Sequence, residues 1–190
     1  MKRFYGLLCA AVLMLPLSAC ASSAESSQVT VPDHMEIEND SVPQEYADCV
    51  KAYFEAVEKD DYAAYTKTIY PPYLESFDKY LRENENADAE TAFHEMAHRF
   101  DEDGYESWRL TKLAMKLMDN PDPEGFFKTY QDMKLIDEAF VTQCESAAKE
   151  YQDVQFSLYA IYSGDAEPVR VSRERELFLI KTEDGVFLFG

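Results

Sequence analysis

The chain has 190 residues, of which 46% are hydrophobic and 14% aromatic, so it is long and apolar enough to fold as one globular domain. Acidic residues outnumber basic ones by 37 to 18, which gives a formal net charge of −19. This balance argues against nucleic acid as a partner, because nucleic-acid-binding domains carry a basic face. It also argues against adhesion to anionic lipid headgroups through surface charge.

The N-terminus has the three parts of a secretory signal. Lys2 and Arg3 precede an apolar run over 4–17, and small residues lead to Cys20. The run is shorter than the ~20 apolar residues that a membrane-spanning helix needs. Removal of this segment takes two basic residues and no acidic one, so the mature chain has 16 basic and 37 acidic residues and a net charge of −21.

Residues 17–20, Leu-Ser-Ala-Cys, resemble the bacterial lipobox. In proteins with this motif the signal is cleaved before the cysteine, and the cysteine then carries lipid on its thiol and its amine. The resemblance implies a signal peptide over 1–19, lipid attachment at Cys20 and an extracytoplasmic protein anchored to the bacterial cell membrane. A plain signal peptide that is cleaved near Ala21 or Ala24 is the alternative.

The mature chain divides into a tether and a domain. Residues 20–42 are rich in Ser, Ala, Glu and Asp and predict a disordered tether, while 43–190 predict one folded domain. Cys9 leaves with the signal, so Cys49 and Cys144 are the cysteines of the domain. Outside the cell these two can form a disulfide. Two buried free thiols are the alternative, because both cysteines lie among apolar residues.

Helical patterns dominate the first part of the domain. Apolar residues at steps of three and four predict an amphipathic helix over 46–57, opened by Pro43. Asp61 is placed to cap a second helix over 62–70, which ends at the prolines that follow. Further helical segments are predicted over 73–81, over 89–100 and over most of 124–151, the last in two pieces that meet near Lys134.

Strand patterns dominate the last part of the domain. Residues 154–162 alternate between apolar and polar, 169–181 form a second strand, and Asp-Gly at 184–185 predicts a tight turn into 186–189. The segment 105–118 fits either a helix face or a strand. Helices first and strands last indicate an α+β domain, in which N-terminal helices pack on a C-terminal antiparallel sheet.

Two segments resemble nuclear transport factor two-like domains, a cystatin-like cone fold. Residues 50–57 and the Lys-Asp-Asp-Tyr step at 59–62 look like the opening helix of that superfamily, and 177–189 look like its terminal hairpin. The resemblance implies a curved, cone-like sheet wrapped around a long helix, and it makes 105–118 a strand. It implies no single activity, because one fold hosts many functions.

One motif is typical of a metal-dependent enzyme. His94-Glu95-Met96-Ala97-His98 is a literal HExxH, in which two imidazoles one helical turn apart bind zinc and the glutamate acts as general base. A projection at 100° per residue places both histidines outside the apolar face of the helix, toward solvent. The longer zincin pattern is absent, because Asp101 stands where a glycine belongs. A third ligand is sought first at Asp101, Asp119 and Glu124.

Together these patterns predict a membrane-anchored surface lipoprotein with a non-catalytic ligand- or partner-binding domain. The alternative is a small zinc metallopeptidase that uses His94, Glu95 and His98. Under the first interpretation no residue is assigned to catalysis, to a cofactor or to a metal, and Cys20 is the lipid attachment site. The expected partners are the membrane, through the lipid, and an unknown small molecule or protein.

Overall fold

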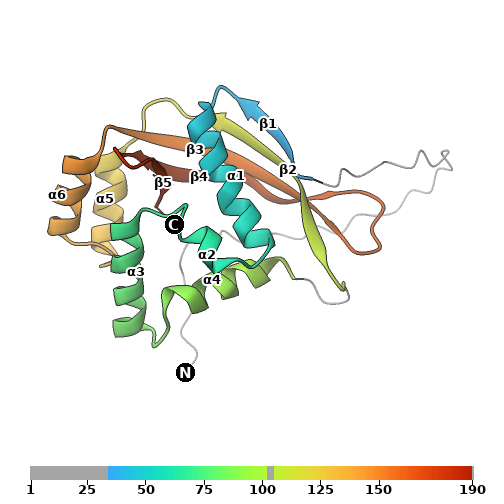
Figure 1. Cartoon of the computed structure of the whole chain (residues 1–190), viewed down its shortest axis with the longest axis horizontal. Helices are drawn as coiled ribbons and strands as arrows, with labels where there is room; N and C mark the ends of the chain where they lie inside the picture. Colours follow the sequence, from blue (N-terminus) through green and yellow to red (C-terminus); the bar gives the residue numbers. More distant parts are fainter. Residues whose placement is uncertain (1–33, 102–104, 190) are drawn as a thin grey trace.

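The structure is a computed structural model that describes residues 34–101 and 105–189. A curved five-stranded sheet carries the helices, and α1 crosses one face of it (Figure 1). The predicted signal peptide and Cys20 lie outside the described residues. The elements in chain order are β1 (Glu36–Asp40), α1 (Gln44–Glu58), α2 (Tyr62–Tyr65), α3 (Pro71–Asn84), α4 (Ala89–Ala97), the 3-10 helix η1 (His98–Phe100), β2 (Trp108–Leu117), α5 (Pro123–Asp132), α6 (Glu138–Ala147), β3 (Glu150–Tyr162), β4 (Val169–Lys181) and β5 (Val186–Leu188).

The strands lie in the sheet in the order of the sequence, β1-β2-β3-β4-β5. The pairs from β2 to β5 are antiparallel, whereas β1 runs parallel to β2. The predicted meander of three closing strands is confirmed, and Gly185 provides the turn residue with its φ of 141°. Such a φ is open to glycine at little steric cost.

The predicted C-terminal boundary of the disordered tether, at residue 42, is wrong. Residues 20–42 were expected to be disordered, but Glu36–Asp40 form a strand that pairs with Lys112–Lys116 of β2. Met35 and Val42 on either side are buried. This five-residue strand has little strand propensity of its own, so its pairing with β2 and these two apolar anchors hold it in place.

Strand β2 settles the ambiguous segment 105–118. Trp108–Leu117 form a strand that pairs antiparallel with β3, with a register shift between Leu110 and Lys112. The Glu58 carboxylate at the end of α1 accepts a hydrogen bond from the Leu110 backbone N–H at 2.7 Å. The first helix is therefore fastened to the sheet at a β-bulge, where a ladder is locally disrupted.

Helices α1, α2, α4 and α5 begin close to where the sequence predicts. Pro43 precedes α1, and the Asp61 side chain accepts from the Ala64 backbone N–H as the cap of α2. Helix α2 ends at Tyr65, earlier than expected, and α3 begins at Pro71 itself, because proline suits the first helical position. Three more aspartates cap helices in the same way, namely Asp88, Asp122 and Asp137.

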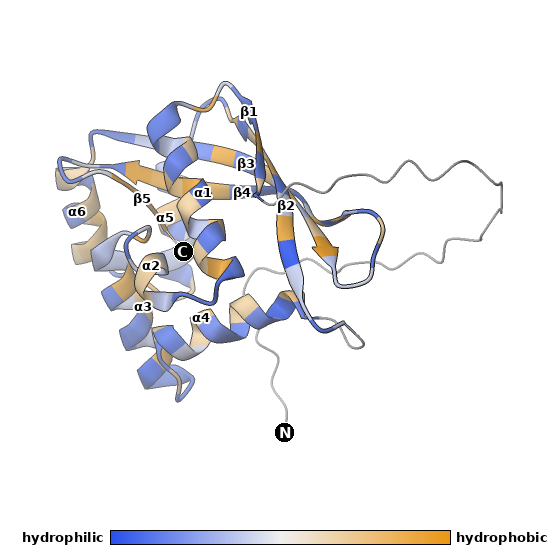
Figure 2. Cartoon of the chain, turned by 45° about the vertical axis from the view of Figure 1, so that its right-hand side comes forward, coloured by the Kyte–Doolittle hydropathy of each residue, from blue (hydrophilic) through white to orange (hydrophobic). Residues whose placement is uncertain are grey.

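The core lies between α1 and the sheet and extends under α3, α5 and α6. Apolar residues alternate along β3 and gather in the second half of β4 (Figure 2). At the α5/α6 end, rings pack at centroid distances of 4.2 to 6.5 Å. We call this group the aromatic cluster; it contains Tyr70, Tyr73, Phe126, Phe127, Tyr130, Phe140, Tyr151, Phe178 and Phe189.

The structure confirms the predicted α+β class, with helices packed on a curved sheet. Lys134, with φ 61°, separates α5 from α6 where two pieces were expected. The sheet differs from the prediction in one pairing, since β1 adds a parallel strand to an otherwise antiparallel sheet. Within the described part of the chain, none of the helices is long and apolar enough to cross a membrane.

Candidate functional site

The two cysteines of the domain are both free, so the disulfide considered between Cys49 and Cys144 is not present in the structure. The Cys49 thiol lies 3.3 Å from the Val186 carbonyl oxygen and 3.8 Å from that of Thr68. Cys144 is fully buried on α6, beside Tyr70. Each sulfur thus faces its own partners, on different elements.

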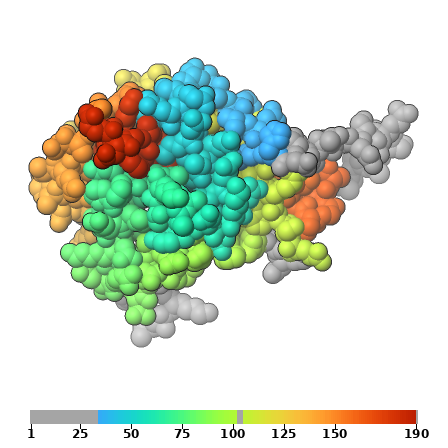
Figure 3. Space-filling view, viewed as in Figure 1, coloured from blue at the N-terminus to red at the C-terminus, as the bar shows by residue number. Residues whose placement is uncertain are grey.

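Cys49 lies in a groove that follows α1. The groove has a volume of about 530 Å³, within the range of small-ligand sites. Its lining along α1 runs from Glu45 to Lys59, the residue that follows the helix, fourteen residues apart or about 21 Å at 1.5 Å per residue. In the space-filling view α1 lies beside α2 and the closing hairpin (Figure 3). The lining residues are Glu45, Cys49, Ala52, Glu55, Ala56, Lys59, Asp61, Ala64, Lys67, Thr68, Gly185 and Val186.

Small side chains form the floor of this groove. Cys49, Ala52 and Ala56 succeed one another at helical steps, and Ala64 faces them from α2. Bulky residues of α1 such as Phe54 point the other way, into the core. The helix thus buries its large face on the sheet and keeps a shallow, largely apolar channel on the opposite side.

Charged groups stand along the rim of the groove. Glu45 is paired with Lys181 of β4, and Glu55 is paired with Lys51 on α1 at 3.6 Å. Burial raises the pKa of the Cys49 thiol to about 12, so this sulfur stays protonated at neutral pH. A protonated thiol is a weak nucleophile, so the groove can hold a molecule better than it can attack one.

The HExxH histidines lie apart from the groove floor, on α4 and η1. The His94 Nδ1 atom is 2.6 Å from Oδ1 of Asp60, and His98 Nε2 is 3.6 Å from Oδ2 of the same carboxylate. Their side chains are 39% and 61% exposed, as the helical projection predicted. Asp60 belongs to the α1–α2 turn, with φ 50°. The two imidazoles of the motif thus contact the same Asp60 carboxylate.

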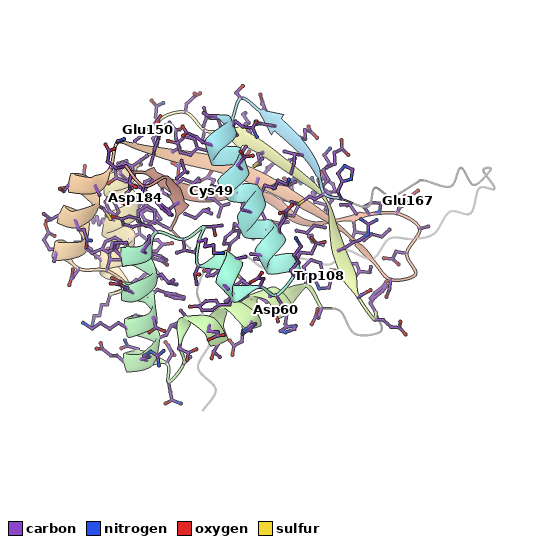
Figure 4. The ribbon with its side chains drawn as sticks, in the orientation of Figure 1. Cys49, Asp60, Trp108, Glu150, Glu167 and Asp184 are labelled. Carbon is purple, nitrogen blue, oxygen red and sulfur yellow. The ribbon has the colours of Figure 1, made fainter. Side chains whose placement is uncertain are left out.

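The contacts continue from His98 to the sheet. His98 Nδ1 is 2.8 Å from Asp101 Oδ2, and the Trp108 indole N–H donates to Asp101 Oδ1 at 2.9 Å. These hydrogen bonds lower the pKa of Asp101, since both favour the ionised carboxylate. Figure 4 labels Asp60 and Trp108 at the same end of the molecule, and Cys49 on α1.

The motif does not form a metal centre in the described structure. Among residues 34–101 and 105–189, no group of three or more His, Cys, Asp or Glu side chains is arranged to hold a metal ion. Glu95, the general base of a zinc peptidase, is exposed. Of the three residues considered as a third ligand, Asp101 contacts His98 through a direct hydrogen bond. Asp119 lies just after β2, and Glu124 lies in the first turn of α5.

Sequence reasoning missed Asp60 and the groove for different reasons. Asp60 was noted only as part of the Lys-Asp-Asp-Tyr step at 59–62, and its distance of 34 residues from His94 hides their contact. The groove has a weak signal in the sequence, namely the small residues at 49, 52 and 56, which recur at helical steps along one flank of an amphipathic helix. Comparison with protein-family models, with curated proteins and with solved structures finds no match to this chain.

Proposed function

We propose that this protein is a lipid-anchored surface protein of a bacterial cell, and that its domain is a non-catalytic module that binds a ligand or partner in the groove along α1. The lipobox-like residues ending at Cys20 support the anchor. The groove of about 530 Å³ carries the binding half of the proposal. Lipid would hold the chain at the membrane, and the net charge of the mature chain, −21 from 16 basic and 37 acidic residues, would keep the domain off anionic headgroups.

The chemistry of the groove supports binding rather than catalysis. Its described lining contains no imidazole, and its one thiol is held protonated by burial. General acid–base or nucleophilic work needs a group whose pKa is tuned near the working pH. Apolar floor and charged rim are instead the usual composition of a site that fixes a ligand by shape and a few polar contacts.

The family resemblance supports the same proposal. The segments that look like nuclear transport factor two-like domains are the ones that border the groove, namely α1 with the α1–α2 turn and the β4–β5 hairpin. The curved sheet around a long helix is consistent with a cone-like domain. Because that fold hosts binding modules as well as enzymes, the resemblance leaves the ligand to be found by experiment.

Filling the groove tests the binding half. Ala52 is exposed at the groove floor, so Ala52→Trp should leave the fold intact and occupy the channel. The probe is anilinonaphthalene sulfonate, a dye that gains fluorescence on apolar surface. We expect Ala52→Trp to abolish dye binding, and Asp48→Trp, on an exposed part of α1 outside the lining, to retain it. Equal dye binding by the two variants would refute the groove as the site.

Metabolic labelling tests the anchor. Cells that express the protein are fed a labelled fatty acid, and we expect the label in the parent and in Cys9→Ala but not in Cys20→Ala. Cys9→Ala is the matched control, because it also removes a cysteine from the first twenty residues. Label that enters Cys20→Ala as readily as the parent would overturn the lipoprotein assignment and leave the groove proposal standing.

A further inference from the structure

A second, smaller cavity lies at the opposite end of the sheet from the aromatic cluster. It has a volume of about 170 Å³, which suits one small headgroup rather than a drug-sized molecule. It shares no lining residue with the groove along α1. The cavity is lined by Asp101, Tyr105, Glu106, Ser107, Trp108 and Tyr162.

Three of the six lining residues are aromatic, and the sheet puts them side by side. Trp108 and Tyr162 are direct partners in the β2–β3 ladder, so their side chains share one face. Tyr105 packs on Tyr162 with ring centroids 5.0 Å apart, and Phe100 packs on Trp108 at the same distance. Tyr105 is nevertheless 40% exposed, one of two large hydrophobic residues with this much exposure in the described chain.

The charged groups that line the cavity are negative. Asp101 and Glu106 are carboxylates, and the described residues that line the cavity include no basic side chain. The contacts with His98 and Trp108 keep Asp101 ionised by lowering its pKa. Asp165 stands nearby and accepts a hydrogen bond from the Tyr105 hydroxyl at 3.4 Å. Aromatic rings with carboxylates at the rim are the surroundings in which a cation is most favoured.

We propose that this cavity binds an alkylated ammonium headgroup, such as a quaternary ammonium. Ring faces attract the cation through their quadrupoles, and the alkyl groups cover the apolar part of the walls. The two carboxylates offset the charge. A bare ammonium is more strongly hydrated and gains less from leaving water. The proposal is independent of the groove along α1 and of the lipid anchor.

The chain carries its own reporter for this site, because Trp108 is its single tryptophan. Tetramethylammonium chloride and choline are titrated into the protein while Trp108 emission is followed, against sodium chloride at equal ionic strength. The neutral carbon isostere of choline, dimethylbutanol, is titrated in parallel. We expect a saturable change in emission with both cations and none with sodium chloride or the neutral isostere. No response to either cation, or a response to the isostere equal to that of choline, would overturn the proposal.

Variants locate the site. Tyr105→Leu should weaken choline binding about two- to thirtyfold, as the loss of one cation–π contact predicts. Glu106→Gln should weaken it as well, with the larger effect at low salt. Tyr159→Leu is the matched control, because this tyrosine lies on the same strand as Tyr162 but its ring already faces Lys112 at 5.6 Å. Unchanged affinity in Tyr105→Leu and Glu106→Gln, with melting temperatures equal to that of the parent, would place the cation elsewhere and refute the assignment.

Discussion

The two ends of the sheet use aromatic side chains in different ways. At the end of the sheet near α5 and α6, which we call the closed end, the rings of the aromatic cluster pack against one another under α3, α5 and α6. Phe178, for example, has the ring neighbours Phe126, Phe127, Tyr151 and Phe189. At the open end, Tyr105 packs on Tyr162 and Trp108 packs on Phe100, and carboxylates lie beside these rings. The same residue types therefore build a scaffold where other rings surround them and a binding surface where water and charge reach them.

The largest difference between the ends should appear in stability. Phe178→Ala should cost about 3–5 kcal/mol in free energy of unfolding, because a ring buried to 6% exposure leaves a cavity among its neighbours. Tyr105→Ala at the open end should cost less than about 1 kcal/mol, because its ring is 40% exposed. Urea unfolding followed by circular dichroism measures both. Equal losses would show that the open end is part of the core.

The second-largest loss of stability should come from breaking the hydrogen bond between Glu58 at the end of α1 and the backbone of β2. Glu58→Ala removes the acceptor of the Leu110 N–H and should cost about 1–3 kcal/mol, the usual penalty for orphaning a half-buried donor. Glu55→Ala is the control, because Glu55 meets Lys51 on the helix surface and should cost less than about 0.5 kcal/mol. Amide hydrogen exchange at Leu110 should speed up in Glu58→Ala alone. Unchanged protection there would show that the bulge is satisfied in another way.

A carboxylate at the closed end should make stability depend on pH. Burial raises the pKa of Asp153 and the nearby Glu176 adds to the shift, while a hydrogen bond from the Asp122 backbone opposes it. A raised carboxyl pKa favours folding below the ordinary value of 3.8 and loses that contribution as the pH rises through the folded value. Asp153 is partly solvated, which screens its charge, so Asp153→Asn should stabilise the domain at pH 7 by less than about 1 kcal/mol and should not do so at pH 3. The exposed Asp132→Asn is the control. A loss of stability at pH 7 in Asp153→Asn would contradict the sign.

The smallest effect is expected from the histidines. His94→Ala and His98→Ala should each change the free energy of unfolding by less than about 0.5 kcal/mol, because both side chains are exposed and meet their aspartate partners at the surface. Metal analysis of the purified parent and of the double variant accompanies the unfolding curves. One zinc ion per chain that survives dialysis in the parent, and is lost in the double variant, would reverse this reading of the motif.

The sequence predicted elements whose cause is local. The steps of three and four in α1, the capping aspartates and the Asp-Gly turn each act within a few residues, so they could be recognised without coordinates. Strand β1 could not, because Glu36–Asp40 form a strand through the ladder with Lys112–Lys116, far along the chain. For the same reason, the sequence alone left open whether 105–118 forms a helix or a strand, and the pairing of β2 with β3 decides for a strand.

The candidate sites were less accessible than the fold. The exposure of His94 and His98 followed from the helical projection alone, and it was correct. Their contact with Asp60 depends on the turn between α1 and α2, which places Asp60 beside α4 and η1. The acid and aromatic residues of the second cavity stand close in sequence, at 101 and 105–108, but Tyr162 joins them through the β2–β3 register. Sites that are assembled by tertiary contact leave little trace in a single sequence.

The parallel strand β1 has a mechanical consequence for a protein that is held at its N-terminus. In the proposed anchored protein, drag on the domain pulls on the chain just before β1. The strand pairs with β2 at five register positions and is flanked by the buried Met35 and Val42. The side chain of Asn39, within the strand, hydrogen-bonds the Val42 backbone just after it. A pull along the strand axis loads these ladder bonds together in shear rather than opening them one by one. Strand β1 would thus bear force that is transmitted from the anchor, and α1 and the groove along it would stay unperturbed.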